Sequence, residues 1–177
     1  MNHVRPCLLP PGALLVRQGD PQGYADCFVA EVGFAVTLPQ FVEAFYRGGV
    51  FRVERVLLAL ALRSPSTDAQ AGALARGEID TFAIWRVEER TGDQMLLRAS
   101  VGRTRSWFMV APAAEGAGTR LYFGSSVAPE RGSEPGSAPR MGWAFRALLG
   151  FHKAYSRVLL GSARERLART IRPGAPS

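Results

Sequence analysis

Apolar residues fall at every second position in the first clearly patterned stretch of the chain, residues 24–37. The alternating side chains are Phe28, Ala30, Val32, Phe34 and Val36. Period-two alternation is typical of a β-strand that buries one face, so we predict a strand here. The segment before it, residues 1–23, is punctuated by proline and glycine. We expect that segment to be extended or loosely ordered.

Three short helices are predicted next, over residues 38–47, 50–62 and 68–76. Pro39 stands in the first turn of the first helix, where the missing amide hydrogen is tolerated. Gly48 ends that helix, and either Ser66 or Thr67 caps the third. The pattern thus predicts a helical connection between the first strand and the rest of the chain.

Four further strand-like runs cover residues 80–89, 93–101, 104–112 and 119–127. The turns between them are short, which is typical of an antiparallel meander. Alternation places apolar side chains on one face, among them Trp85, Phe108 and Phe123. The other face combines four arginines with large apolar residues, namely Phe82, Ile84, Leu96, Trp107 and Tyr122. That second face is therefore either a partner or dimer surface, or assigned one residue out of register.

The last patterned segment, residues 140–169, predicts one helix of about 45 Å. It follows a flexible loop, 128–139, and precedes a short tail, 170–177. Four basic side chains fall on one stripe of this helix: Arg146, Lys153, Arg157 and Arg164. The opposite stripe consists of Ala144, Leu148, Phe151, Tyr155, Leu159 and Ser162. The helix is thus predicted to be amphipathic, with the apolar stripe facing the sheet.

The order of these elements predicts an α+β fold of the helix-grip kind. A single antiparallel sheet needs its apolar face covered, and the C-terminal helix is the only predicted element long enough to cover it. In this arrangement the sheet wraps around the long helix, and the short helices follow the first strand.

Several stretches of the chain resemble the START/Bet v1-like superfamily, and more closely an uncharacterised bacterial family within it. They are YADCF at 24–28, GRTRSW at 102–107, RLYFGSSV at 120–127 and LLGFHKAYSRVLL at 148–160. The resemblance covers residues 24–169, which we expect to be a single domain. It implies a cavity between sheet and helix that holds a hydrophobic or amphipathic ligand. Because such proteins usually have more than five strands, either one strand lies within residues 1–23 or the fold is reduced.

Composition and charge limit the kinds of molecule that the protein is expected to bind. With 177 residues, 47% hydrophobic and 21% charged, the chain fits one soluble domain. No signal peptide or spanning run is evident, so we expect a cytoplasmic protein. Residues 140–172 carry the whole net charge of +7. An anionic membrane surface and a merely solvated helix face both explain this stripe, while nucleic acid lacks an accompanying motif. The preference for arginine over lysine indicates a GC-rich bacterial genome, but it does not explain why the charge is concentrated there.

Cysteine and histidine are too scarce for a metal centre. Cys7 and Cys27 are the only cysteines, and His3 and His152 the only histidines. The cysteines are able to pair, but no framework spacing suggests that they do. We therefore expect neither a metal nor a cofactor.

Candidate chemistry concentrates on the inward side of the long helix. His152 is the side chain best suited to proton transfer near neutral pH, with Tyr155 as a hydrogen-bond donor, in a cyclase or dehydratase. A structural histidine that bonds a sheet carbonyl or Ser125 is the competing interpretation. The predicted ligand-binding residues are Trp85, Phe108, Phe123, Leu148, Phe151, His152 and Tyr155. These aromatic residues either line a cavity or fill a packed core.

The arginines of the GRTRSW stretch have two interpretations as well. Either Arg103 or Arg105 binds a ligand carboxylate, or an arginine there pairs across the hairpin with Glu88, Glu89 or Asp93. The sequence favours a ligand-binding domain over an enzyme, with docking on an anionic surface as a third hypothesis.

Overall fold

The computed structural model describes residues 4–17, 24–48, 66–100, 103–113, 117–127 and 143–171. For residue 17 and residues 143–154 the description covers the backbone but not the side chains. The predicted helix at 50–62 and the predicted loop at 128–139 lie outside the described residues.

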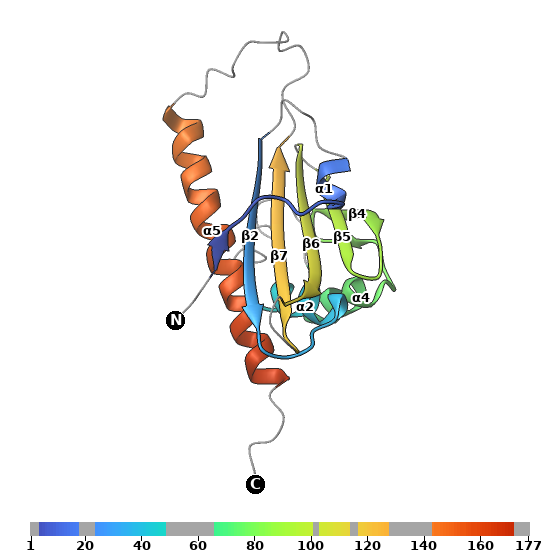
Figure 1. Ribbon diagram of the computed structural model, residues 1–177. Helices are drawn as coiled ribbons and strands as arrows, with labels where there is room; N and C mark the ends of the chain where they lie inside the picture. The colour runs from blue at the N-terminus through green and yellow to red at the C-terminus, as the bar shows by residue number, and fades with distance from the viewer. Residues whose placement is uncertain are drawn as a thin grey trace.

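The described strands form one antiparallel sheet in the order β1-β2-β7-β6-β5-β4-β3 (Figure 1). Their bounds are β1 Arg5–Pro6, β2 Tyr24–Val32, β3 Thr81–Phe82, β4 Trp85–Arg90, β5 Gln94–Ala99, β6 Thr104–Pro112 and β7 Thr119–Val127. The described helices are α1 Leu14–Arg17, α2 Leu38–Tyr46, α4 Asp68–Arg76 and α5 Trp143–Thr170. This is a helix-grip-like α+β fold, as the order of patterns predicts.

Local sequence explains where α2 and α4 begin. Thr37 and Thr67 are their N-caps, and each forms a capping box with a glutamine three residues on. Thr67 rather than Ser66 is therefore the cap of α4. Gly77 ends α4 in the left-handed conformation, with a φ of 81°, which glycine adopts without strain.

The predicted strand at 80–89 is wrong in one respect, because it is two strands. β3 and β4 form a hairpin in which Phe82 stands opposite Trp85, and Ala83 in its turn has a φ of 52°. The turn interrupts the alternation, so Phe82 belongs to the main core and not to the opposite face. The register of β4 shifts again between Val87 and Glu89, at a bulge.

Helix α2 packs its aromatic side chains onto one face of the sheet, which we call the inner face. The Phe45 ring lies 4.8 Å from Phe108 and 4.7 Å from Phe123, centre to centre. Phe41 and Tyr46 lie 5.6 and 5.7 Å from Phe108. These spacings are typical of favourable aromatic pairs, so this part of the inner face is filled.

Helix α5 lies along β2 and also contacts α2 (Figure 1). Its buried side chains within the described part recur at helical spacing beside buried Gly161: Ser156, Leu159, Leu160, Ala163 and Leu167. The predicted helix ends at 169, and the observed one at Thr170. Ile171 still packs against the core, and the remainder of the predicted tail, 172–177, lies outside the described residues.

The N-terminal segment, residues 4–17, covers the other face of the sheet, which we call the outer face. In Figure 1 it crosses the sheet on the side away from α2. Leu14 and Leu15 are buried with Leu96 and Trp107 in a second hydrophobic cluster. Residues 4–17, which we expected to be extended or loosely ordered, contain extended β1 and helical α1, and the two leucines hold the segment in place by apolar burial. One further strand, β1, lies in this segment.

Candidate functional site

The inner face of the sheet changes from apolar to polar along its strands. Beyond the phenylalanines packed by α2, the next inward-facing positions of β6 and β7 are Ser106 and Ser125, which are paired. Asp26 of β2 is opposite Ser125 in the register. We call this region, formed by Tyr24, Asp26, Ser106, Ser125 and Trp85, the polar end. All five of these residues are buried or half-buried.

A hydrogen-bonded network centres on the Asp26 carboxylate. The Ser125 hydroxyl donates to Asp26 Oδ1 at 2.7 Å, and the Ser125 amide donates to the same oxygen at 3.2 Å. The Tyr24 hydroxyl donates to Asp26 Oδ2 at 2.9 Å. Burial, and then the bond to Asp26, raises the pKa of the Tyr24 hydroxyl above its ordinary value. Tyr24 therefore remains a protonated donor in the physiological range.

Among the described side chains, three buried polar atoms lack a hydrogen-bond partner. Trp85 Nε1 belongs to the sheet, Ser156 Oγ to α5, and Arg47 Nε to the residue that ends α2. Ser156 is 1% exposed, and the half-buried Trp85 packs against the main core. Arg47 Nε is likewise unbonded, but it faces Asp68 Oδ2 at 3.8 Å. Because buried polar groups are nearly always satisfied, the indole and the hydroxyl each call for a partner, either an ordered water or a bound molecule.

The residues predicted from sequence to bind a ligand fall into three groups. Phe108 and Phe123 are buried in the packed aromatic core, with exposures of 0% and 4%, which favours the packed-core alternative for them. Trp85 and Tyr155 are partly buried at the margin of that core. Leu148, Phe151 and His152 belong to α5, but their side chains lie outside the described residues.

Sequence reasoning missed the Asp26 network. Its signal was present, since polar residues occupy positions that continue the inward alternation of the strands: Asp26 before Phe28, and Ser125 after Phe123. Polar residues at inward positions are exceptions to the expected pattern and therefore mark either a buried network or a site.

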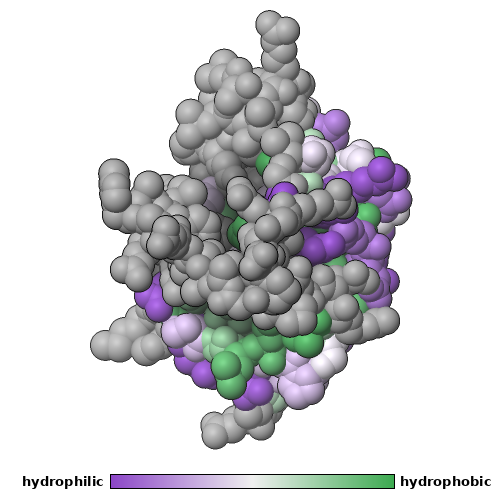
Figure 2. Space-filling model, turned by 90° about the horizontal axis from the view of Figure 1, so that it is seen from above, coloured by the Kyte–Doolittle hydropathy of each residue, from purple (hydrophilic) through white to green (hydrophobic). Residues whose placement is uncertain are grey.

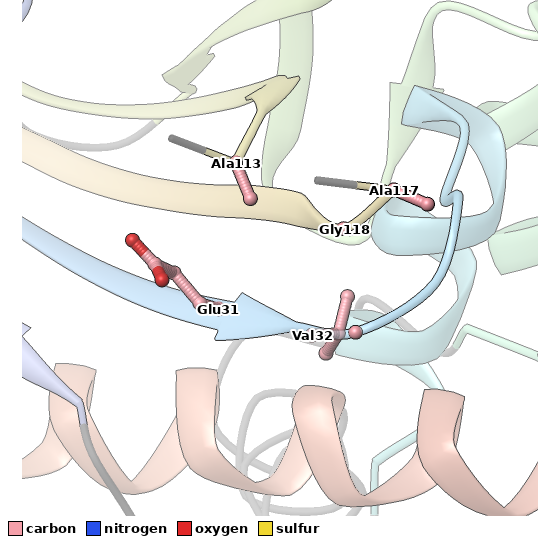
Figure 3. Close-up of a pocket in the computed structure, with 6 residues that line it drawn as sticks. Glu31, Val32, Ala113, Ala117 and Gly118 are labelled. Atoms are coloured by element: carbon pink, nitrogen blue, oxygen red, sulfur yellow. The ribbon is translucent and has the colours of Figure 1, made fainter. Parts of the chain in front are cut away.

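A pocket lies at the C-terminal end of β2, away from the polar end (Figure 3). There Glu31 and Val32 face Ala113, Ala117 and Gly118, which lie between β6 and β7. The pocket measures about 230 Å³ and is open to solvent. Glu31 is the one charged side chain among its described lining residues, and it already accepts a hydrogen bond from Arg120 Nε at 2.9 Å. Alanine and glycine supply most of the remaining lining. The pocket therefore offers few groups for specific recognition.

Arg157 and Arg164, the two residues of the basic stripe whose side chains are described, both contact β2. The Arg157 guanidinium lies 5.4 Å from the centre of the Phe28 ring, within cation–π range. Arg164 Nε donates to the backbone oxygen of Glu31 at 2.9 Å. Both arginines thus help to seat α5, whatever else they contact. Arg146 and Lys153 have side chains outside the described residues.

The acidic-pair interpretation holds for Arg105. Its Nε donates to Glu88 Oε2 at 2.6 Å, and its Nη2 donates to Oε1 at 3.3 Å. Arg98 adds a weaker contact to Glu88 at 3.8 Å. The charged surface of β4 to β6 is therefore partly neutralised by its own neighbours.

Comparison with protein-family models, with curated proteins and with solved structures finds no match. Within the described part of the chain, no three or more His, Cys, Asp or Glu residues are grouped so that they could hold a metal ion. The described helices include none with the length and apolar character needed to cross a membrane.

Proposed function

We propose that the protein binds an amphipathic small molecule between the polar end of the sheet and helix α5. The observation that carries this proposal is the pair of buried, unbonded polar atoms, Trp85 Nε1 and Ser156 Oγ. They belong to the two layers that enclose the inner face. The resemblance to START/Bet v1-like proteins supports the same location.

The chemistry of these atoms suggests what the ligand carries. An indole nitrogen only donates a hydrogen bond, whereas a serine hydroxyl both donates and accepts. A ligand oxygen, such as that of a carbonyl, hydroxyl or carboxylate group, would satisfy either atom. The apolar part of the molecule would rest on Tyr155 and Trp85, which are partly buried against the core. A hydrophobic molecule bearing at least one oxygen, such as a fatty acid, fits this description.

Native mass spectrometry of the purified chain, followed by titration with a fluorescent anthroyloxy fatty acid, tests the proposal. Trp85→Phe and Ser156→Ala each remove one unbonded atom and keep most of the shape. We expect each variant to bind the probe about tenfold more weakly, which corresponds to roughly 1.4 kcal/mol. If both atoms contact the same molecule, the double variant will lose less than the sum of the two.

The matched control is Trp107→Phe, which removes an indole donor that is already bonded, on the outer face. It should leave the affinity for the probe unchanged. Ser156→Ala should not destabilise the ligand-free protein, because the lost hydroxyl had no partner. Wild-type affinity in both Trp85→Phe and Ser156→Ala, with no co-purifying molecule, would refute the proposal.

Catalysis is a second candidate, and the Asp26 network favours it, because it holds a carboxylate beside a protonated tyrosine. Such a pair suits general acid–base chemistry, with His152 as a further candidate group. If the protein only carries its ligand, mass spectrometry should recover the bound molecule with its mass unchanged. Loss of water from that molecule, abolished by Asp26→Asn and His152→Ala, would indicate a dehydratase instead.

A further inference from the structure

The two cysteines of the chain lie against each other on the outer face of the sheet. β1 pairs with β2 so that Pro6 stands opposite Phe28. The next pair in this register is Cys7 and Cys27, and the Cys7 amide donates to the Cys27 carbonyl oxygen at 3.0 Å. Both side chains are free thiols, and the Cys7 thiol donates to Cys27 Sγ with the sulfurs 3.2 Å apart.

This arrangement places both backbones within reach of a covalent link. Residues directly opposite each other in an antiparallel pair have Cα atoms about 4.5–5.5 Å apart. Disulfides join Cα atoms that are about 4.4–6.8 Å apart. A small side-chain rotation would therefore suffice, without movement of the strands. We infer that Cys7 and Cys27 form a reversible intramolecular disulfide that fastens the N-terminal segment to β2.

The sulfurs are better suited to a disulfide than to a metal. Structural zinc is held by four ligands, and two thiols supply only half of them. No group of three or more His, Cys, Asp or Glu residues gathers anywhere in the described ranges. A pair of thiols without further ligands has thiol–disulfide exchange as its characteristic reaction.

Glutathione disulfide is a sufficient oxidant, and the exposures set the order of events. Cys7 is half-buried, whereas Cys27 is 4% exposed, so Cys7 meets the oxidant first. Its thiolate attacks one sulfur of glutathione disulfide and releases one glutathione. The Cys27 thiolate then attacks Cys7 Sγ and displaces the second glutathione. Two protein thiols have given two electrons and two protons, and one glutathione disulfide has become two glutathiones.

The second step requires the Cys27 thiolate. Burial of its side chain, with the Cys7 sulfur close beside it, raises the pKa of the Cys27 thiol. Fewer Cys27 thiolates are therefore present at neutral pH, and the thiolate is the attacking species. The short distance between the sulfurs offsets this disadvantage, because the attack is intramolecular.

The Cys7–Cys27 disulfide would determine how firmly the N-terminal segment is held on the outer face. Cys27 shares its cluster with Leu14, Leu15 and Trp107. In the reduced protein, two-residue β1 and the contacts of α1 hold the segment in place. In the oxidised protein the loop from residue 7 to residue 27 is closed, so the segment stays tethered even when α1 detaches.

The test uses the purified full-length chain, incubated under native conditions with glutathione disulfide. We expect both free thiols to disappear, the intact mass to fall by two hydrogen atoms, and a proteolytic fragment to join Cys7 to Cys27. Cys27→Ser should stop with one glutathione on Cys7. Cys7→Ser should stay largely unmodified until the chain is denatured, because its remaining thiol is buried.

Three results would overturn the inference. The first is a native protein that retains both thiols while a denatured sample reacts with the same oxidant. The second is a wild-type chain that stops with glutathione on Cys7, as the Cys27→Ser variant should. The third is non-reducing electrophoresis that finds links between chains instead of within one chain.

Discussion

A single glutamine fixes the contact between the N-terminal segment and the outer face. Gln94 Oε1 accepts hydrogen bonds from the Leu14 amide and from Trp107 Nε1, both at 2.9 Å. Its Nε2 donates to the Gly12 carbonyl oxygen at 3.3 Å. The buried glutamine thus satisfies donors from a helix and a strand that the hydrophobic contact alone would leave unbonded.

Replacing Gln94 with leucine should therefore be costly. Gln94→Leu leaves two buried donors without an acceptor, and we expect a loss of about 3 kcal/mol in the free energy of unfolding, measured in urea. Trp107→Phe removes one of these donors. The loss in the free energy of unfolding of the double variant should therefore be about 1 kcal/mol smaller than the sum of the two single losses. Strictly additive losses would mean that the bonds to Gln94 contribute little.

Tyr24 gives the polar end a dependence on alkaline pH. Its pKa is raised in the folded protein, so the unfolded chain loses the proton first as pH rises. The contribution of Tyr24 is therefore complete below about pH 10 and declines above it. Tyr24→Phe should cost about 1 kcal/mol at neutral pH, and the difference from wild type should shrink above about pH 10. Urea denaturation between about pH 8 and pH 11 measures this.

Ser125→Ala is the control for this titration. It removes a second side-chain donor to Asp26 but no group that ionises in the alkaline range. Its stability should run parallel to that of wild type over the same pH interval. A Tyr24→Phe curve that also runs parallel would show that the phenol does not titrate differently on folding.

At the level of elements, a glycine allows helix α1 to approach the sheet. A Cβ at Gly124 would lie 2.9 Å from the Asp26 carbonyl oxygen, 3.1 Å from Trp107 Cε3 and 3.2 Å from Leu15 Cδ2. We expect Gly124→Ala to lower the free energy of unfolding by about 1–3 kcal/mol. Hydrogen exchange of the α1 amides should accelerate, because Leu15 is displaced.

Gly33→Ala is the matched variant, since a Cβ there meets no atom within 4 Å. Its stability should stay within about 0.5 kcal/mol of wild type. If Gly124→Ala is equally harmless, the outer layer is more loosely packed than the distances indicate.

The sequence predicts those elements whose signals are local. The capping threonines, Thr37 and Thr67, and the alternation of β2 and β7 depend only on near neighbours, so helices and strands were located closely. The hairpin between β3 and β4 was missed because Ala83 adopts a positive φ, which alanine rarely signals. The role of residues 4–17 depends on contacts with β5, β6 and β7, which are distant in sequence.

The candidate site was predicted only in part, for a related reason. Alternation correctly placed Trp85, Phe108 and Phe123 on the inner face. It did not reveal that α2 would pack its own rings onto the two phenylalanines. The Asp26 network, in turn, requires the pairing of β2 with β7, whose members are almost one hundred positions apart. A register of that kind is a tertiary property.

For the whole molecule, the main consequence is that one sheet has both faces covered. Helices α2 and α5 lie on the inner face, and the N-terminal segment lies on the outer one. The sequence left the large apolar residues of the outer face without an explanation other than a partner or an error of register. Leu96 and Trp107 are in fact buried by the same chain. In the view from above, the described residues show one green hydrophobic area bordered by hydrophilic residues, and more hydrophilic residues lie on the right (Figure 2).

Uncovering the outer face should therefore cause self-association. Leu14→Asp combined with Leu15→Asp places two charges where both side chains are 1% exposed, so α1 should detach while the sheet persists. The released surface contains Leu96 and Trp107, an apolar patch at which copies of the chain would associate. Analytical ultracentrifugation should detect concentration-dependent dimers or larger species. At protein concentrations where the variant is still monomeric, iodide should quench Trp107 fluorescence in a background with phenylalanine at positions 85 and 143.

The comparison that decides this prediction uses the same segment and the same charges. Leu8 and Val16 are 92% and 55% exposed, so Leu8→Asp combined with Val16→Asp adds two aspartates without removing buried contacts. That variant should sediment as the unmodified chain does, with Trp107 still protected. If both double variants behave alike, burial by the N-terminal segment is not what keeps the outer face from self-association. A monomeric Leu14→Asp, Leu15→Asp variant with accessible Trp107 would instead show that the exposed face is not adhesive, because the arginines of β4 to β7 keep copies apart.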